Sequence, residues 1–97
     1  MIQHSQLLAV FNSAHRVMKA ESILKQGGFT ILLIPAPRAL STDCGLAIRF
    51  DSDIYDSVQQ ALASENTSPT FIYKKINDSN YELIWNGEHI EDTTLLP

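Results

Sequence analysis

The sequence has little cysteine, no long apolar run and few cations, and each shortage removes a class of protein. Its single cysteine cannot form an internal disulfide, and a free thiol persists in the cytosol. No apolar run approaches the ~20 residues of a membrane span. The first residues, MIQHSQLLAVF, lack the basic region and the cleavage site of a signal peptide. These shortages predict a cytoplasmic protein without a membrane partner.

The charge balance and the scattered ligand residues exclude further classes. The chain has 7 Lys and Arg against 11 Asp and Glu, a net charge of -4. Nucleic acid needs a basic face, so we expect no nucleic-acid partner. The 3 histidines are scattered and no second cysteine lies at ligand spacing from Cys44. We therefore expect neither a metal site nor a cofactor.

The 97 residues are enough for one domain with one modest core. We expect this single domain to have its core at about 6–86 and a loose tail at 87–97. Apolar runs predict five strands, at 6–12, 29–35, 44–50, 69–76 and 81–85.

Two stretches with helical spacing separate the strands. The first has Ser13 as its N-cap, with Asn12 as the rival, and ends at Gly27-Gly28. The second follows the Asp-Ser-Asp cluster at 51–53 and ends near Asn66. Their apolar stripes comprise Ala14, Val17, Ala20 and Leu24 in the first helix and Ile54, Val58, Ala61 and Leu62 in the second.

The order β-α-β-β-α-β-β predicts an α+β two-layer sandwich of the ferredoxin-like, split βαβ type, with an extra C-terminal strand. Right-handed crossovers would place both helices on one face of the sheet. A doubly wound parallel sheet is the weaker alternative, because the loop 36–43 is too short for a crossover helix.

This topology has a consequence for Cys44. The strand 44–50 would lie between 6–12 and 29–35 and run antiparallel to both. Cys44 would then lie near Asn12 and Ser13, at the start of the first helix. A helix N-terminus has unpaired N–H groups and a partial positive charge, which favour a thiolate.

The neighbours of Cys44 would act on the thiol in different directions. Arg38 and a protonated His15 would add to the positive potential, whereas the adjacent Asp43 would oppose it. Gly45 would leave the backbone open beside the sulfur, so that a bulky group could approach.

The residues PAPRALSTDCGLAIRF at 35–50 resemble the P-x-P-R-x-x-S-x-x-C-G-x-x-I/L signature of DUF3343, a family of small bacterial proteins described as selenium/sulfur carrier protein-like. The resemblance covers about residues 6–50. It implies a cytosolic carrier rather than an enzyme, with protein donors and acceptors of sulfur or selenium. By the resemblance, Cys44 would hold the chalcogen as a persulfide or selenopersulfide. Its loop would be shaped by Pro37, Arg38, Ser41 and Gly45.

Other interpretations of these residues stay open. Cys44 could be a packing residue in a small interaction module, or the thiol of a redox sensor. Arg38 could be a solvated loop residue, Ser41 a turn former and His15 an exposed first-turn residue. A cysteine protease is disfavoured, because no protease signature surrounds Cys44.

Aromatic residues recur in the last two predicted strands, namely Phe71, Tyr73, Tyr81 and Trp85. In a sandwich with helices on one side only, the other sheet face meets water or a partner. The sequence therefore predicts an aromatic interface there, used in a homodimer. The alternative is that these rings complete the core or lie under the C-terminal tail.

Overall fold

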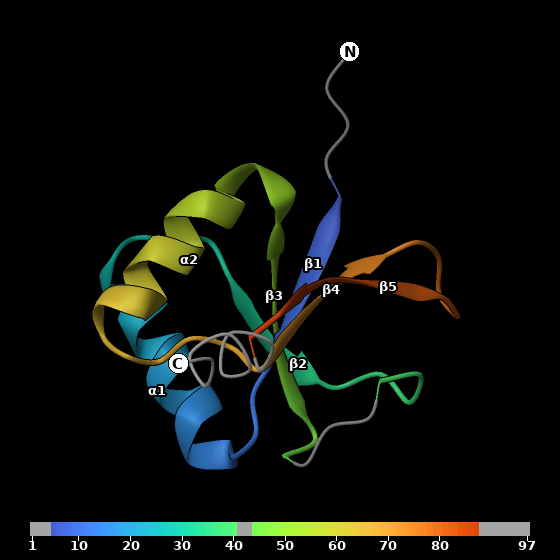
Figure 1. Cartoon of the computed structure of the whole chain (residues 1–97), viewed down its shortest axis with the longest axis horizontal. Coiled ribbons are helices and arrows are strands. Elements are labelled where there is room, and N and C mark those ends of the chain that lie inside the picture. The colour runs from blue at the N-terminus through green and yellow to red at the C-terminus, as the bar shows by residue number, and fades with distance from the viewer. Residues whose placement is uncertain (1–4, 41–43, 88–97) are drawn as a thin grey trace, which may run out of the picture.

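The computed structural model of the protein describes residues 5–40 and 44–87, which form an antiparallel sheet with helices on one side (Figure 1). The elements of this part of the chain are β1 (Gln6–Val10), α1 (Ala14–Gln26), β2 (Leu32–Pro35), β3 (Leu46–Asp51), the 3-10 helix η1 (Ser52–Ile54), α2 (Tyr55–Ser64), β4 (Phe71–Lys75) and β5 (Tyr81–Asn86). The α+β class predicted from the sequence is confirmed.

The sheet has the strand order β2-β3-β1-β4-β5, and all neighbours are antiparallel. β3 lies between β1 and β2, as the sequence predicted. Its first residues lie beside the last residues of β1, since Ala47 is paired with Val10. The chain segments around Cys44 and around the start of α1 therefore meet at one end of the sheet.

α1 begins and ends where the sequence predicted. The Ser13 side chain is the N-cap, and its Oγ accepts a hydrogen bond of 3.2 Å from the Arg16 N–H. Gly27 is the C-cap, and Gly28 follows with a φ of 83°. The buried stripe consists of Val17, Ala20 and Leu24. Ala14 was expected on this stripe but is exposed, because the first helical turn precedes the segment that packs on the sheet.

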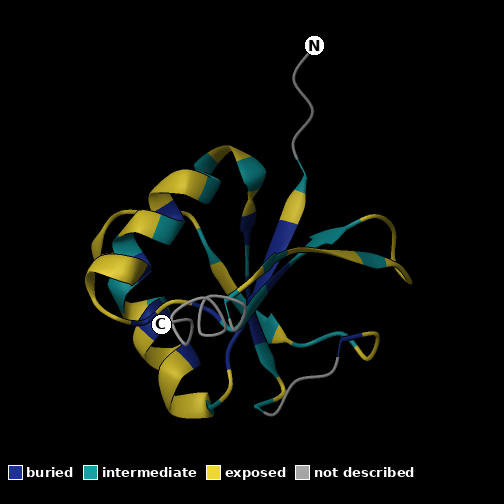
Figure 2. Ribbon diagram, in the orientation of Figure 1, coloured by how far each residue is buried: buried dark blue, intermediate teal, exposed yellow. Residues whose placement is uncertain are grey.

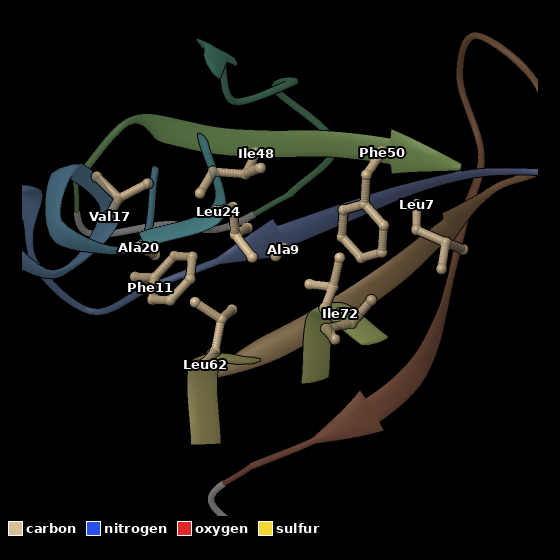
Figure 3. Packing of buried hydrophobic residues seen from close by; sticks show 11 residues of the cluster. Leu7, Ala9, Phe11, Val17, Ala20, Leu24, Ile48, Phe50, Leu62 and Ile72 are labelled. Carbon is tan, nitrogen blue, oxygen red and sulfur yellow. The ribbon is translucent and has the colours of Figure 1, made fainter. Parts of the chain in front are cut away.

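Both helices cover the same face of the sheet, and the core lies between them and the strands (Figure 2). Strand alternation directs Leu7 and Ala9 toward the helices, and Phe11 continues this row past the end of β1. The cluster is completed by Val17, Ala20, Leu24, Ile48, Phe50, Val58, Leu62 and Ile72 (Figure 3). We call the face that these residues build the helix face.

The opposite side of the sheet, the open face, has a smaller apolar cluster. Its buried residues are Leu8 and Val10 from β1, Ala47 from β3, and Leu40 from the loop between β2 and β3. Three of the four predicted aromatic residues pack against it, namely Phe71, Tyr73 and Tyr81. The rings of Phe71 and Tyr73 are tilted, with centroids 6.1 Å apart.

The prediction that Trp85 joins this aromatic set was wrong, because Trp85 packs on the helix face. The pairing of β4 with β5 shifts between Ile72 and Tyr73, so that Tyr73 pairs with Leu83 but Ile72 pairs with Trp85. Ile84 is the extra residue, and one extra residue reverses the alternation of the side chains that follow.

Four predicted strands are shorter than expected. β1 ends at Val10 rather than at 12, and β4 is confined to Phe71–Lys75 within the predicted 69–76. β2 begins at Leu32 rather than at 29, since the Phe29 N–H instead donates to the Leu24 carbonyl at the end of α1. β3 begins at Leu46 rather than at 44. The predicted tail at 88–97 lies outside the described residues. In residues 5–40 and 44–87, no helix is long and apolar enough to cross a membrane.

Candidate functional site

Cys44 lies directly before β3, at the end of the sheet where β1 ends and α1 begins. Its Sγ donates toward the Phe11 carbonyl at 3.5 Å and toward the Leu46 carbonyl at 3.4 Å. Phe11 is followed by Asn12 and by the helix cap Ser13. The structure therefore brings Cys44 to the segment that enters α1, which the topology predicted from the sequence.

The sulfur is half-buried rather than fully exposed. Cys44 packs at the margin of the helix-face cluster. A thiol has one proton, so its S–H is shared between the Phe11 and Leu46 carbonyls. A thiolate has no proton to donate, and both contacts would be lost on ionisation. Both contacts therefore require the protonated thiol, and the stabilised thiolate stays a prediction.

Gly45 shapes the backbone next to the sulfur. Its φ is 72°, a conformation that L side chains rarely adopt. Apart from its two chain neighbours, no atom of the described residues lies within 4 Å of the position of an added Cβ. The Gly45 carbonyl accepts a hydrogen bond of 2.9 Å from the Ala36 N–H, which closes the loop between β2 and β3. The residue after Cys44 therefore combines a fixed backbone with open space.

The loop places Arg38 on the other side of the sheet from the sulfur. The Leu40 N–H donates to the Pro37 carbonyl at 3.0 Å, which forms a tight turn that contains Arg38. Leu40 is 7% exposed and packs on the open face. The turn accordingly lies on the side of the sheet away from the helices (Figure 1), whereas the sulfur of Cys44 packs on the helix face.

Two further predicted site residues, His15 and Arg38, form no hydrogen bond or ion pair with the thiol in the described part of the chain. His15 is exposed on the first turn of α1. Ser41 lies outside the described residues. Within them, no group of three or more His, Cys, Asp or Glu is placed to hold a metal ion.

The sequence reasoning missed two features of this site. The first is the pair of carbonyl acceptors for the S–H group, which depends on a tertiary contact between Cys44 and Phe11. The second is the anchoring of the loop by Leu40. One signal for that anchor was present, since Leu40 is a large apolar residue within an otherwise polar stretch.

Comparison with known proteins gives one match. The model of a family described as "Putative Se/S carrier protein-like" matches residues 6–74. The match includes both helices and Cys44, and it reaches further along the chain than the resemblance at 6–50 suggested. No curated protein and no solved structure matches the chain. Residues 75–97, which include β5, lie outside the matched range.

Proposed function

Because the chain belongs to the family described as "Putative Se/S carrier protein-like", we propose that it carries sulfur or selenium on Cys44 as a persulfide or selenopersulfide. The observation that carries the proposal is the setting of this thiol. Cys44 is the only cysteine of the chain and lies within the matched range. It lies two residues before the start of β3, beside Gly45, and its Sγ contacts the Phe11 carbonyl.

Loading would be a transfer of one sulfane sulfur atom. The Cys44 thiolate attacks the terminal sulfur of a donor persulfide, and a new bond forms between Sγ and that atom. The sulfur–sulfur bond of the donor breaks, and its electron pair leaves with the donor thiolate. An acceptor nucleophile then attacks the terminal atom, and the Cys44 thiolate is regenerated. No external oxidant or reductant is needed.

The thiol must change its contacts before it reacts. At rest, the S–H group is directed to the carbonyls of Phe11 and Leu46. The reacting sulfur has no proton to donate, so it leaves both acceptors and turns toward solvent. We assign Gly45 and Pro37 to shaping the loop, together with Ser41 and Arg38, and His15 to proton donation from the first turn of α1.

We also infer the setting in which the carrier works. The antiparallel order β2-β3-β1-β4, with α1 and α2 on one face, supports a ferredoxin-like arrangement to which β5 adds an edge strand. The acidic charge balance and the single free cysteine support a bacterial cytoplasmic protein that exchanges sulfur with protein partners.

The test is persulfide loading followed by intact mass measurement. The folded protein is treated with a small-molecule persulfide donor and then passed over a desalting column. We expect a mass increase of one sulfur atom that is lost on reduction. The matched control is the double variant Cys44→Ala, Ser22→Cys, which moves the only thiol to an exposed position in the middle of α1.

The control separates a built site from an ordinary thiol. We expect the wild-type protein to retain the added sulfur longer than the double variant, because Cys44 is half-buried whereas position 22 is exposed. Equal retention by the two proteins would contradict the proposal. So would a wild-type thiol that loads only after unfolding.

A second candidate function is a protein-interaction module in which Cys44 only fills space. The observation that favours it is the open face, where Leu32 and Leu83 are 48% and 46% exposed at opposite edges of the sheet. Strand pairing places them in one row with Arg49, Leu8 and Tyr73, and Arg49 is the charged member of that row. In this alternative the open face binds a second copy of the chain, and Cys44 in the folded protein does not react.

A further inference from the structure

The first half of α1, the helix that begins near the thiol, has a basic, exposed surface. His15, Arg16, Met18 and Lys19 are all exposed there, and Met18 is 50% exposed. We call these four residues the basic helix patch. The segment 12–20 contains no acidic residue. This segment begins directly after Phe11, whose carbonyl contacts the sulfur of Cys44.

This placement of charge opposes the stability of the helix. The N-terminal end of a helix has a partial positive charge and is stabilised by Asp or Glu in its first turn. The first turn of α1 has no acidic residue and instead has His15 and Arg16. The charges of Arg16 and Lys19 and the helix dipole therefore add to one positive potential, which weakens the helix slightly but attracts an anionic surface.

Among residues 5–40 and 44–87, the carboxylates that could cancel this potential are engaged or distant, with the exception of Glu65. Glu21 forms an ion pair of 3.1 Å with Lys25, further along α1. Asp51, Asp53 and Asp56 are exposed at the opposite end of the sheet, where β3 passes into α2. β3 separates that end from Cys44 by roughly 20 Å, about two Debye lengths at physiological ionic strength. Glu65 directly follows α2 and is exposed. At this point the chain has come back toward the end of the sheet where α1 begins.

We propose that the basic helix patch is the docking surface for an acidic protein that exchanges sulfur with Cys44. This inference rests on the proposed carrier function and names the chemistry of its partner. The acidic side chains of the partner would face Arg16 and Lys19, and an apolar residue would cover Met18. The net charge of the chain is -4, which by itself would repel an acidic partner. The local positive charge of the basic helix patch makes the contact with such a partner favourable.

The experiment measures how fast Cys44 attacks charged disulfide probes. Each probe is a peptide of six identical residues and one cysteine, activated as its mixed disulfide with thionitrobenzoate. Cys44 forms a disulfide with the peptide, and thionitrobenzoate leaves with the electron pair and is followed by its absorbance. The three probes contain glutamate, serine or lysine. At low salt we expect the glutamate probe to react about fivefold faster than the serine probe, and the lysine probe to be slowest.

The variants locate the effect on the patch. Lys19→Glu should abolish the preference for the glutamate probe. Lys74→Glu makes the same charge change in β4, where residue 74 pairs with Leu7 at the end of the sheet opposite Cys44, and should retain most of the preference. Raising the salt to about 0.5 M should bring the three rates together, because the Debye length then shortens to a few Å.

The outcomes separate this inference from the carrier function itself. If the serine probe does not react with folded protein, the carrier function fails. If it reacts but the probes do not differ, or if both variants lose the preference equally, the docking surface is overturned. Protection of Cys44 by polyuridylate, without any preference for the glutamate probe, would also overturn it and indicate a nucleic-acid partner.

Discussion

At the scale of single residues, the surroundings of the thiol depend on the backbone conformation of Gly45, the residue that follows Cys44. Gly45 has a φ of 72°, and Gly28, at the end of α1, has a φ of 83°. Apart from the two chain neighbours, an added Cβ would contact nothing within 4 Å in the described part of the chain at either position. Substitution at these two sites is therefore opposed by backbone strain alone, and only Gly45 adjoins the sulfur.

We predict that Gly45→Ala lowers the free energy of unfolding by about 1 kcal/mol, because the left-handed region is unfavourable for alanine. The variant should also change the rate at which a neutral alkylating reagent labels Cys44. Gly28→Ala is the matched control, since it has the same strain far from the thiol. Urea unfolding and labelling kinetics measure both effects. A change of labelling rate in Gly28→Ala equal to that in Gly45→Ala would refute the local role of Gly45.

At the scale of elements, α1 has two surfaces with different tasks. One side packs on the sheet through Val17, Ala20 and Leu24, each 0% exposed. The other side carries the basic helix patch near Cys44. Because the two sets of residues do not overlap, stability and partner recognition can be altered separately on this helix.

We predict that Leu24→Ala lowers the free energy of unfolding by about 2–5 kcal/mol, since it leaves a cavity in the core. Met18→Ala, on the exposed side, should change it by no more than about 0.5 kcal/mol. Chemical denaturation of both variants measures the difference. Similar losses in the two would mean that α1 does not pack as described.

At the scale of the whole molecule, the sheet has helices on one side only. In the described part of the chain, Leu40 from the loop between β2 and β3 covers part of the open face. Leu32 and Leu83 on the same face are about half exposed. An apolar face of this kind is typical of an interaction site. The homodimer predicted from the aromatic residues would bury this face.

We predict that the protein dimerises through the open face and that Leu83→Lys shifts it to monomers, because burying an unpaired charge is costly. Met18→Lys is the control, as Met18 has similar exposure on the helix side. Sedimentation equilibrium gives the molecular mass in solution. A monomeric wild-type protein at about 100 µM, well above the micromolar range of ordinary complexes, would contradict the prediction.

The sequence by itself determined the local structure of most elements. Ser13 and Gly27 end α1 because a hydroxyl cap and a glycine act on their own helix, within a few residues. The Asn77–Asn80 turn between β4 and β5 was predictable for the same reason, since the Asn77 side chain accepts from the N–H groups of Ser79 and Asn80. The order of these elements along the chain then predicted that β3 lies between β1 and β2, as the structure shows.

Only the tertiary structure decided the surroundings of the thiol and the faces of the sheet. The acceptors of the Cys44 S–H group belong partly to Phe11, 33 residues away. Leu40 draws the turn with Arg38 to the open face, and one bulge residue, Ile84, moves Trp85 to the helix face. Such features follow from strand register and from packing between distant segments, neither of which local residue preferences specify.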